Sequence, residues 1–269
     1  MASLHCGRQS LTPLYTWPSV RPAAPLPYAP LSHLTILLQL FWHPFPPNTP
    51  FLRGDRMGDT PSKYDEAIQP QPAPIWVTEP RFASPSPITL QLREKIFSFS
   101  GDDFKIKDPN TDTVWFQCKG KAFSLREKKT LNDAYGQPIL NIKETLLNFG
   151  TPDYKVYRGD GSEEQLFKLN AHWTFMKAKG ETTIVNGANG QSLHITLKGD
   201  LRTKHCCIYI GEPKQGGVPI AKIFRPTTNR SFFMDAHDYM VEIAPNVDAA
   251  FIVALCICID EMKKDNNRD

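Results

Sequence analysis

The sequence predicts an all-β domain with one core helix, in which a closed antiparallel barrel surrounds a buried C-terminal hydrophobic helix. Three observations lead to this prediction. Apolar and polar residues alternate with a period of two from Ile88 onward, which is typical of strands with one buried face. Turn-forming residues separate these runs at short intervals. Residues 249–259 are apolar without interruption, and this run predicts a helix buried on every side.

The alternating runs predict a meander of short strands. A first strand is expected at 75–77, and later strands at 88–92, 104–107, 114–118, 122–126, 139–143, 154–158, 166–169, 173–176, 193–198, 206–210, 219–224 and 239–243. Turns rich in Gly, Asn and Asp are expected at 108–110, 132–136, 158–161, 186–190 and 198–200. Strands without helical patterns between them indicate an antiparallel sandwich or barrel.

The C-terminal apolar run carries the signals of a helix, which we expect over residues 246–262. Asn246 is a plausible N-cap, Asp248 complements the positive helix start, and Lys263 and Lys264 suit the C-terminal end. The run is shorter than the about 20 apolar residues that span a bilayer. Only a closed sheet can surround such a helix in a chain of strands.

Composition divides the chain into a proline-rich start and a neutral body. Residues 1–56 hold ten of the 24 prolines and the whole net charge of +3. We expect residues 1–56 to be a disordered extension or a segment absent from the mature protein, 57–73 a linker, 74–263 the folded domain, and 264–269 a polar tail. A neutral body lacks the field that attracts nucleic acid, so no nucleic-acid partner is expected. The six cysteines form no C-x-x-C pair, which indicates an intracellular protein.

An ordered set of motifs resembles the LURP-one-related family. The matching stretches are 75–78 (IWVT), 87–92 (PITLQL), 101–108 (GDDFKIKD), 123–140 (FSLREKKTLNDAYGQPIL, with an Asp-x-x-Gly turn), 154–159 (YKVYRG) and 239–255 (YMVEIAPNVDAAFIVAL). The resemblance covers about residues 74–263. It implies a LURP-one-related or Tubby C-terminal-like domain, a closed barrel of about 12 strands around the helix, in the superfamily that includes the phospholipid scramblases.

The resemblance also implies a non-enzymatic protein. Some members of the superfamily bind phosphoinositides at the membrane, and others have been discussed as lipid scramblases. Our leading hypothesis is a binding or scaffold module that reads phosphoinositides or anionic membrane, and a protein partner is the other partner considered. The alternatives are a scramblase-like membrane lipid protein, or a small-ligand enzyme or carrier. We expect a monomer without a transmembrane segment, cytoplasmic and peripheral at the plasma membrane.

One basic stretch is the candidate site for lipid or phosphate. Several cations at one place can hold inositol phosphates or anionic lipid; the alternative is a solvated strand face. The candidate residues are Lys119, Lys121, Arg126, Lys128 and Lys129. A second, weaker basic group surrounds the expected turn at 198–200, with Lys198, Arg202 and Lys204.

Nothing in the sequence indicates catalysis, a cofactor or a metal. No nucleophile elbow, Walker loop or kinase motif is present. His205 and Cys207 share one strand face, but a structural zinc site needs four ligands. We therefore expect no enzyme activity, no cofactor and no metal site.

Overall fold

The computed structural model describes residues 66–93, 104–120, 128–145, 153–174, 177–200, 205–226 and 238–265. The chain divides after Met57 into two units, and all described residues belong to the second. The predicted N-terminal extension and most of the predicted linker lie outside the described residues, as does the predicted strand at 122–126.

The described residues form twelve strands that close into an antiparallel barrel, as predicted. Each strand pairs with the next along the chain, and six residue pairs between the first and the last strand complete the ring. The strands are β1 (Ile88–Arg93), β2 (Phe104–Lys107), β3 (Val114–Gly120), β4 (Lys129–Asp133), β5 (Pro138–Thr145), β6 (Asp153–Arg158), β7 (Gln165–Thr174), β8 (Lys177–Val185), β9 (Ser192–Asp200), β10 (His205–Ile210), β11 (Val218–Phe224) and β12 (Asp238–Ile243). Two short 3-10 helices, η1 (Pro80–Phe82) and η2 (Pro213–Gln215), are not part of the barrel strands.

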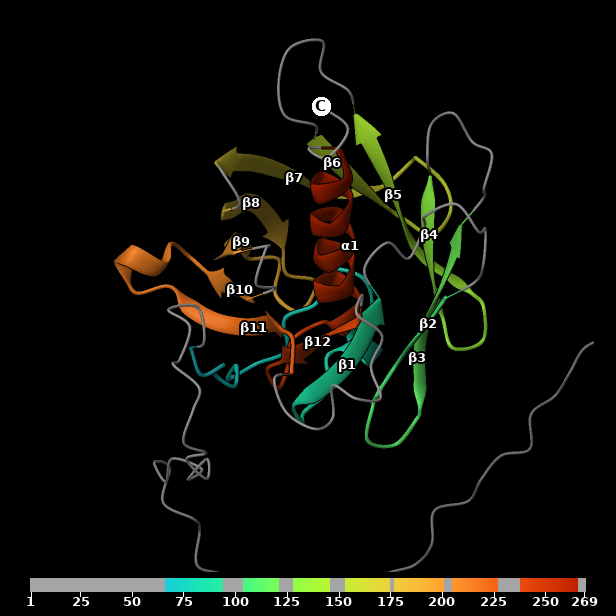
Figure 1. The fold of residues 1–269 in the computed structure, drawn as a ribbon, viewed down its shortest axis with the longest axis horizontal. Helices are drawn as coiled ribbons and strands as arrows, with labels where there is room; N and C mark the ends of the chain where they lie inside the picture. Colours follow the sequence, from blue (N-terminus) through green and yellow to red (C-terminus); the bar gives the residue numbers. More distant parts are fainter. Residues whose placement is uncertain are drawn as a thin grey trace, which may run out of the picture. The chain divides into compact units, whose positions relative to one another are not determined.

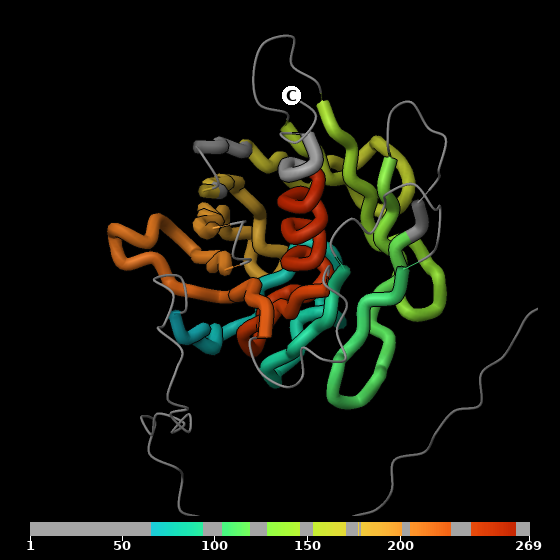
Figure 2. Tube along the Cα trace, in the orientation of Figure 1, coloured from blue at the N-terminus to red at the C-terminus, as the bar shows by residue number. Residues whose placement is uncertain are grey.

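The helix α1 (Ala249–Asp265) stands inside the ring of strands (Figures 1 and 2). Every residue from Ala249 to Ile259 is at most 4% exposed. Inward side chains of the barrel pack on it, as where the Phe167 and Phe251 rings meet edge to face at 5.2 Å between centroids. The prediction of a core helix is therefore confirmed.

Several local predictions were wrong. The turn expected at 132–136 starts later, because β4 runs to Asp133, and its tight part rests on Gly136 at φ 84°. The turn expected at 198–200 is instead the end of β9. The polar strand β8 carries little alternation and was missed. Residues 75–77 make no strand, since Ile75 forms only an isolated parallel bridge with Val247.

The N-cap of α1 is Asp248, not Asn246 as predicted. One oxygen of the Asp248 carboxylate, Oδ1, accepts hydrogen bonds from the amides of Ala250 (2.9 Å) and Phe251 (3.1 Å), which is the usual N-cap geometry. Asn246 lies in the preceding turn with φ 65°, and its side chain donates to the Gln71 carbonyl oxygen.

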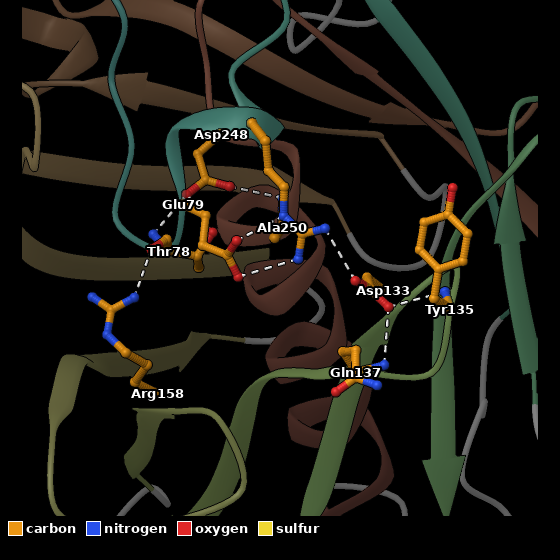
Figure 3. A network of polar contacts seen from close by, with 9 residues as sticks. Thr78, Glu79, Asp133, Tyr135, Gln137, Arg158, Asp248 and Ala250 are labelled. Atoms are coloured by element: carbon orange, nitrogen blue, oxygen red, sulfur yellow. Dashed lines mark hydrogen bonds and ion pairs between the residues drawn. The ribbon is translucent and has the colours of Figure 1, made fainter. Parts of the chain in front are cut away.

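The same carboxylate joins the helix to the segment that precedes β1. Its second oxygen, Oδ2, accepts from the amides of Val77 (3.0 Å) and Thr78 (2.8 Å) and from the Thr78 hydroxyl (2.8 Å). Asp248 is fully buried. Burial raises the pKa of this carboxyl, while the backbone and hydroxyl donors act in the opposite direction by stabilising its charged form. Figure 3 shows Asp248 between Thr78 and Ala250.

A second polar group extends this network across the end of the barrel (Figure 3). The Arg158 guanidinium donates to the Thr78 carbonyl oxygen at 2.6 Å, and Arg81 reaches Asp133 at 3.0 Å. Burial raises the pKa of Asp133, but the amides of Gln137 and Tyr135 and the Arg81 guanidinium outweigh it, so the net shift is downward. The Asp-x-x-Gly turn thus helps to hold the segment before β1 in place.

We predict that Val253→Asp abolishes soluble expression, because it places an unpaired charge in the barrel core. Val253 is 0% exposed, and we expect a loss of about 4 kcal/mol or more in the free energy of unfolding. Soluble yield and thermal unfolding measure the effect. The matched control is Val185→Asp, since Val185 is 60% exposed. Wild-type yield from the Val253 variant would contradict a core helix.

We also predict that Asp248→Asn lowers the free energy of unfolding by about 2–4 kcal/mol, measured by urea denaturation. The new amide group is a donor and faces the donors of Val77 and Thr78. The control is Asp108→Asn, because the carboxylate of partly exposed Asp108 accepts the Asn110 amide in that turn, a bond that Asn retains. Equal stability of both variants would show that the five-bond network adds little.

Candidate functional site

Four lysines lie side by side on the outer face of neighbouring strands. Lys143 on β5 is paired in register with Lys155 on β6, and Lys155 with Lys168 on β7. Lys128 directly precedes β4, and the register of β4 with β5 places it level with Lys143. We call these four residues the lysine row.

Strand alternation turns these side chains away from the core. Tyr154 and Val156, which flank Lys155, are at most 1% exposed, and Phe167 and Leu169, which flank Lys168, are at most 3% exposed. Because successive side chains point to opposite faces of a strand, the lysines between them face outward. The lysine row is therefore a consequence of packing these strands on α1.

The lysine row concentrates like charges. Neighbouring strands lie about 4.8 Å apart, so the four positions span roughly 15 Å. Like charges directly opposite one another destabilise a sheet. Part of the charge is balanced, since Lys168 pairs with the Asp153 carboxylate at 2.5 Å. Two other lysines donate to neutral acceptors, Lys128 to the Asp160 carbonyl oxygen and Lys143 to the Ser162 hydroxyl.

Lys155, in the middle of the lysine row, has no hydrogen-bond or ion-pair partner among the described residues. It is partly exposed, as are the other three lysines. An ammonium group is a compact charge with three donors and no acceptor. A line of such groups can hold the oxygens of phosphate or carboxylate groups that approach from solvent.

The structure describes only part of the sequence-predicted site. Lys121 and Arg126 lie outside the described residues, and Lys119 lies on β3 with its side chain outside the description. Lys128 belongs to the lysine row. In the weaker basic group, Lys198 pairs with Glu212, while Arg202 and Lys204 lie outside the described residues.

Lys129 requires a correction, because it points into the barrel and not outward. Its backbone pairs with Ile142, and its ammonium group forms an ion pair with Glu261 of α1. The side chains of Lys129 and Glu261 are 5% and 6% exposed. The alternation of β4 thus separates two adjacent lysines, with Lys128 on the outside and Lys129 in the core.

Sequence reasoning missed Lys143, Lys155 and Lys168. Each stands beside buried residues in a strand that the sequence did predict, so its outward direction was readable. What was missing was the register between strands, which brings lysines far apart in the chain to the same level.

The described residues offer little for nucleophilic or metal chemistry. Burial raises the pKa of Cys118 and Cys258 far above the ordinary thiol value and that of Cys207 to about 11, which disfavours the reactive thiolate. Within the part of the chain described, no three His, Cys, Asp or Glu side chains gather as metal ligands would.

Fold and surface together define a class: a closed antiparallel barrel that is filled by its own C-terminal helix and carries a row of four lysines on its outer face. A family model described as LURP-one-related matches residues 88–260. The chain therefore belongs to the LURP-one-related family, as its motifs predicted.

Curated relatives and a solved structure agree with this assignment. Protein LURP-one-related 10 of Arabidopsis thaliana is 26% identical over 197 residues, which cover 72% of this chain and 99% of that protein. Protein LURP-one-related 15 of the same organism is 25% identical, over 71% of this chain and 87% of its own. An X-ray structure of an Arabidopsis thaliana protein matches 70% of this chain and 98% of its own with a TM-score of 0.51 and 23% identity. The structural match supports the fold.

We predict opposite outcomes for the same substitution at two adjacent lysines. Lys129→Met leaves Glu261 as a buried charge without this partner, and should lower the free energy of unfolding by about 3–5 kcal/mol. Lys128→Met removes a partly exposed surface charge and should change it by less than about 0.5 kcal/mol. Urea denaturation of both variants measures the difference. Equal effects would contradict the inward position of Lys129.

Proposed function

We propose that this protein is a non-enzymatic binding module that docks on anionic, phosphate-bearing membrane surfaces through the lysine row. The observation that carries the proposal is the cross-strand pairing of Lys143, Lys155 and Lys168. A sheet that places like charges opposite one another loses stability, and an anionic ligand restores it by supplying the opposite charge.

The filled barrel supports a role for the outer surface. The interior is occupied by α1, whose apolar residues are buried along their whole length, so a small-ligand carrier would have to displace its own core. The scramblase alternative requires α1 to leave the barrel and cross the bilayer. Among the residues described, no helix combines the length and the apolar character that crossing a membrane requires.

Phosphoinositides are the specific anionic lipids that we propose as ligands. Each basic residue near an anionic membrane contributes about 1 kcal/mol of attraction. A headgroup with several phosphates presents its charges within the roughly 15 Å that the lysine row spans. We infer that the protein is cytoplasmic and peripheral at the membrane, where such lipids meet the solvent.

We predict that Lys155→Gln weakens vesicle binding of the full chain about five-fold, and that Lys143→Gln combined with Lys155→Gln weakens it about 25-fold. Co-sedimentation measures this with vesicles of phosphatidylcholine alone, with added phosphatidylserine, and with added phosphatidylinositol bisphosphate at matched total charge. Binding should weaken steeply with salt, since the Debye length falls from about 10 Å at 0.1 M to about 3 Å at 1 M.

The matched control is Lys214→Gln, which removes one exposed lysine from η2, outside the lysine row. This variant should bind as the wild type does. Equal losses of binding from Lys155→Gln and Lys214→Gln would show that vesicle binding depends on general surface charge and not on a defined site. Absence of binding to both anionic vesicles would contradict the proposed function and leave a protein partner as the subject of the next search.

A further inference from the structure

The loop between β6 and β7, residues 159–164, folds back over the outer face of β5. The buried side chain of Asn141 on β5 donates to the carbonyl oxygens of Gly159 (3.0 Å) and Gly161 (2.8 Å). The Gly159 amide donates to the Ile139 carbonyl oxygen at 2.8 Å, and Gly159 adopts φ 58° at the start of the loop. These bonds hold the loop against the strand that carries Lys143.

The loop occupies two members of the lysine row. The Lys128 ammonium group donates to the Asp160 carbonyl oxygen, and that of Lys143 donates to the Ser162 hydroxyl. Among the described residues, Lys155 and Lys168, further along the row, make no hydrogen bond or ion pair with the loop. The lysine row is thus covered at one end and open at the other.

The loop also brings negative charge to the covered end. The Glu163 carboxylate folds back to accept the Ser162 amide at 2.8 Å. The backbone amides of Glu163 and Ser162 lower the pKa of this carboxyl, and the nearby Lys143 and Lys128 lower it further. Gly161 permits the fold, because a side chain at this position would collide with the Glu163 carboxylate.

The adjacent acidic residue behaves differently. Glu164 pairs with the Arg158 guanidinium at 2.8 Å, so its charge is already met by a residue outside the lysine row. Glu163 and Glu164 thus carry the same charge in the same loop but face different cations.

We propose that the β6–β7 loop is an internal competitor, which covers Lys128 and Lys143 in the unbound protein and releases them when a phosphate-bearing surface binds. This inference rests on the proposed function and adds its regulation. In the unbound state the loop offers a carbonyl oxygen, a hydroxyl and the Glu163 carboxylate where the ligand would offer phosphate oxygens. Binding is then an exchange of one set of acceptors for another, and its strength depends on the charge of the loop.

The test compares Glu163→Gln with Glu164→Gln in the full chain, by co-sedimentation with phosphatidylcholine vesicles that contain phosphatidylinositol bisphosphate. Glu163→Gln should strengthen binding roughly three- to five-fold, because it weakens the competitor. Glu164→Gln makes the same change in net charge and should alter binding by less than about two-fold. Raised salt should shrink the gain from Glu163→Gln, since both the loop contact and the membrane contact are screened.

Each outcome separates the two proposals. Equal strengthening of vesicle binding by both variants would overturn the competition, because it would show that binding depends on net charge alone. Binding of all three proteins with equal affinity would overturn the competition and leave the membrane-binding proposal intact. A failure of all three to bind any anionic vesicle would overturn the proposed function, and the competition with it. Unchanged thermal unfolding of both variants verifies that the barrel itself is unaltered.

Discussion

The burial of α1 on every side is the constraint on which the rest of the structure depends. A helix that is apolar all round cannot lie on an open sheet, because its outer half would face water. Closing the sheet solves this problem, and the pairing of β1 with β12 completes the closure. Each strand then turns one face toward the interior that α1 occupies and the other face outward, where polar side chains can lie. Barrel closure and strand alternation therefore follow from one buried helix.

Polar side chains determine how the helix sits along the barrel, since apolar contact alone is not directional. At the start of α1, Asp248 accepts five hydrogen bonds: two cap the helix, and three join it to residues 77 and 78 (Figure 3). Near the other end, the Tyr239 hydroxyl donates to Asp260 at 2.7 Å, and Lys129 pairs with Glu261. A shift of α1 along its axis would break both groups of contacts at once, leaving buried polar atoms without partners.

A filled interior leaves the outside of the barrel as the surface at which we propose binding. The lysine row arises from the register of neighbouring strands, because no single strand contains more than one of its lysines. The acidic β6–β7 loop covers one end of the row. Strand pairing sets the spacing of the lysines, whereas the loop is held by hydrogen bonds from Asn141, Lys128 and Lys143. In the proposed function, this difference between strands and loop lets the charge of the loop regulate binding.

The sequence by itself determined the fold class, because each of the three patterns that predict it is local. Alternation, turn residues and the apolar run at 249–259 can each be recognised from residues that are close together in the chain. The alternation of the predicted strands also contained the outward direction of Lys143, Lys155 and Lys168, although these lysines were not recognised as a site. The N-cap predicted from the sequence was wrong by two residues. Asp248 takes this position with the support of its contacts with residues 77 and 78, which are far away in the chain. Only the tertiary structure decided which lysines stand together and that Lys129 is buried against Glu261. Strand register depends on how twelve strands close around one helix, and no local pattern contains that information.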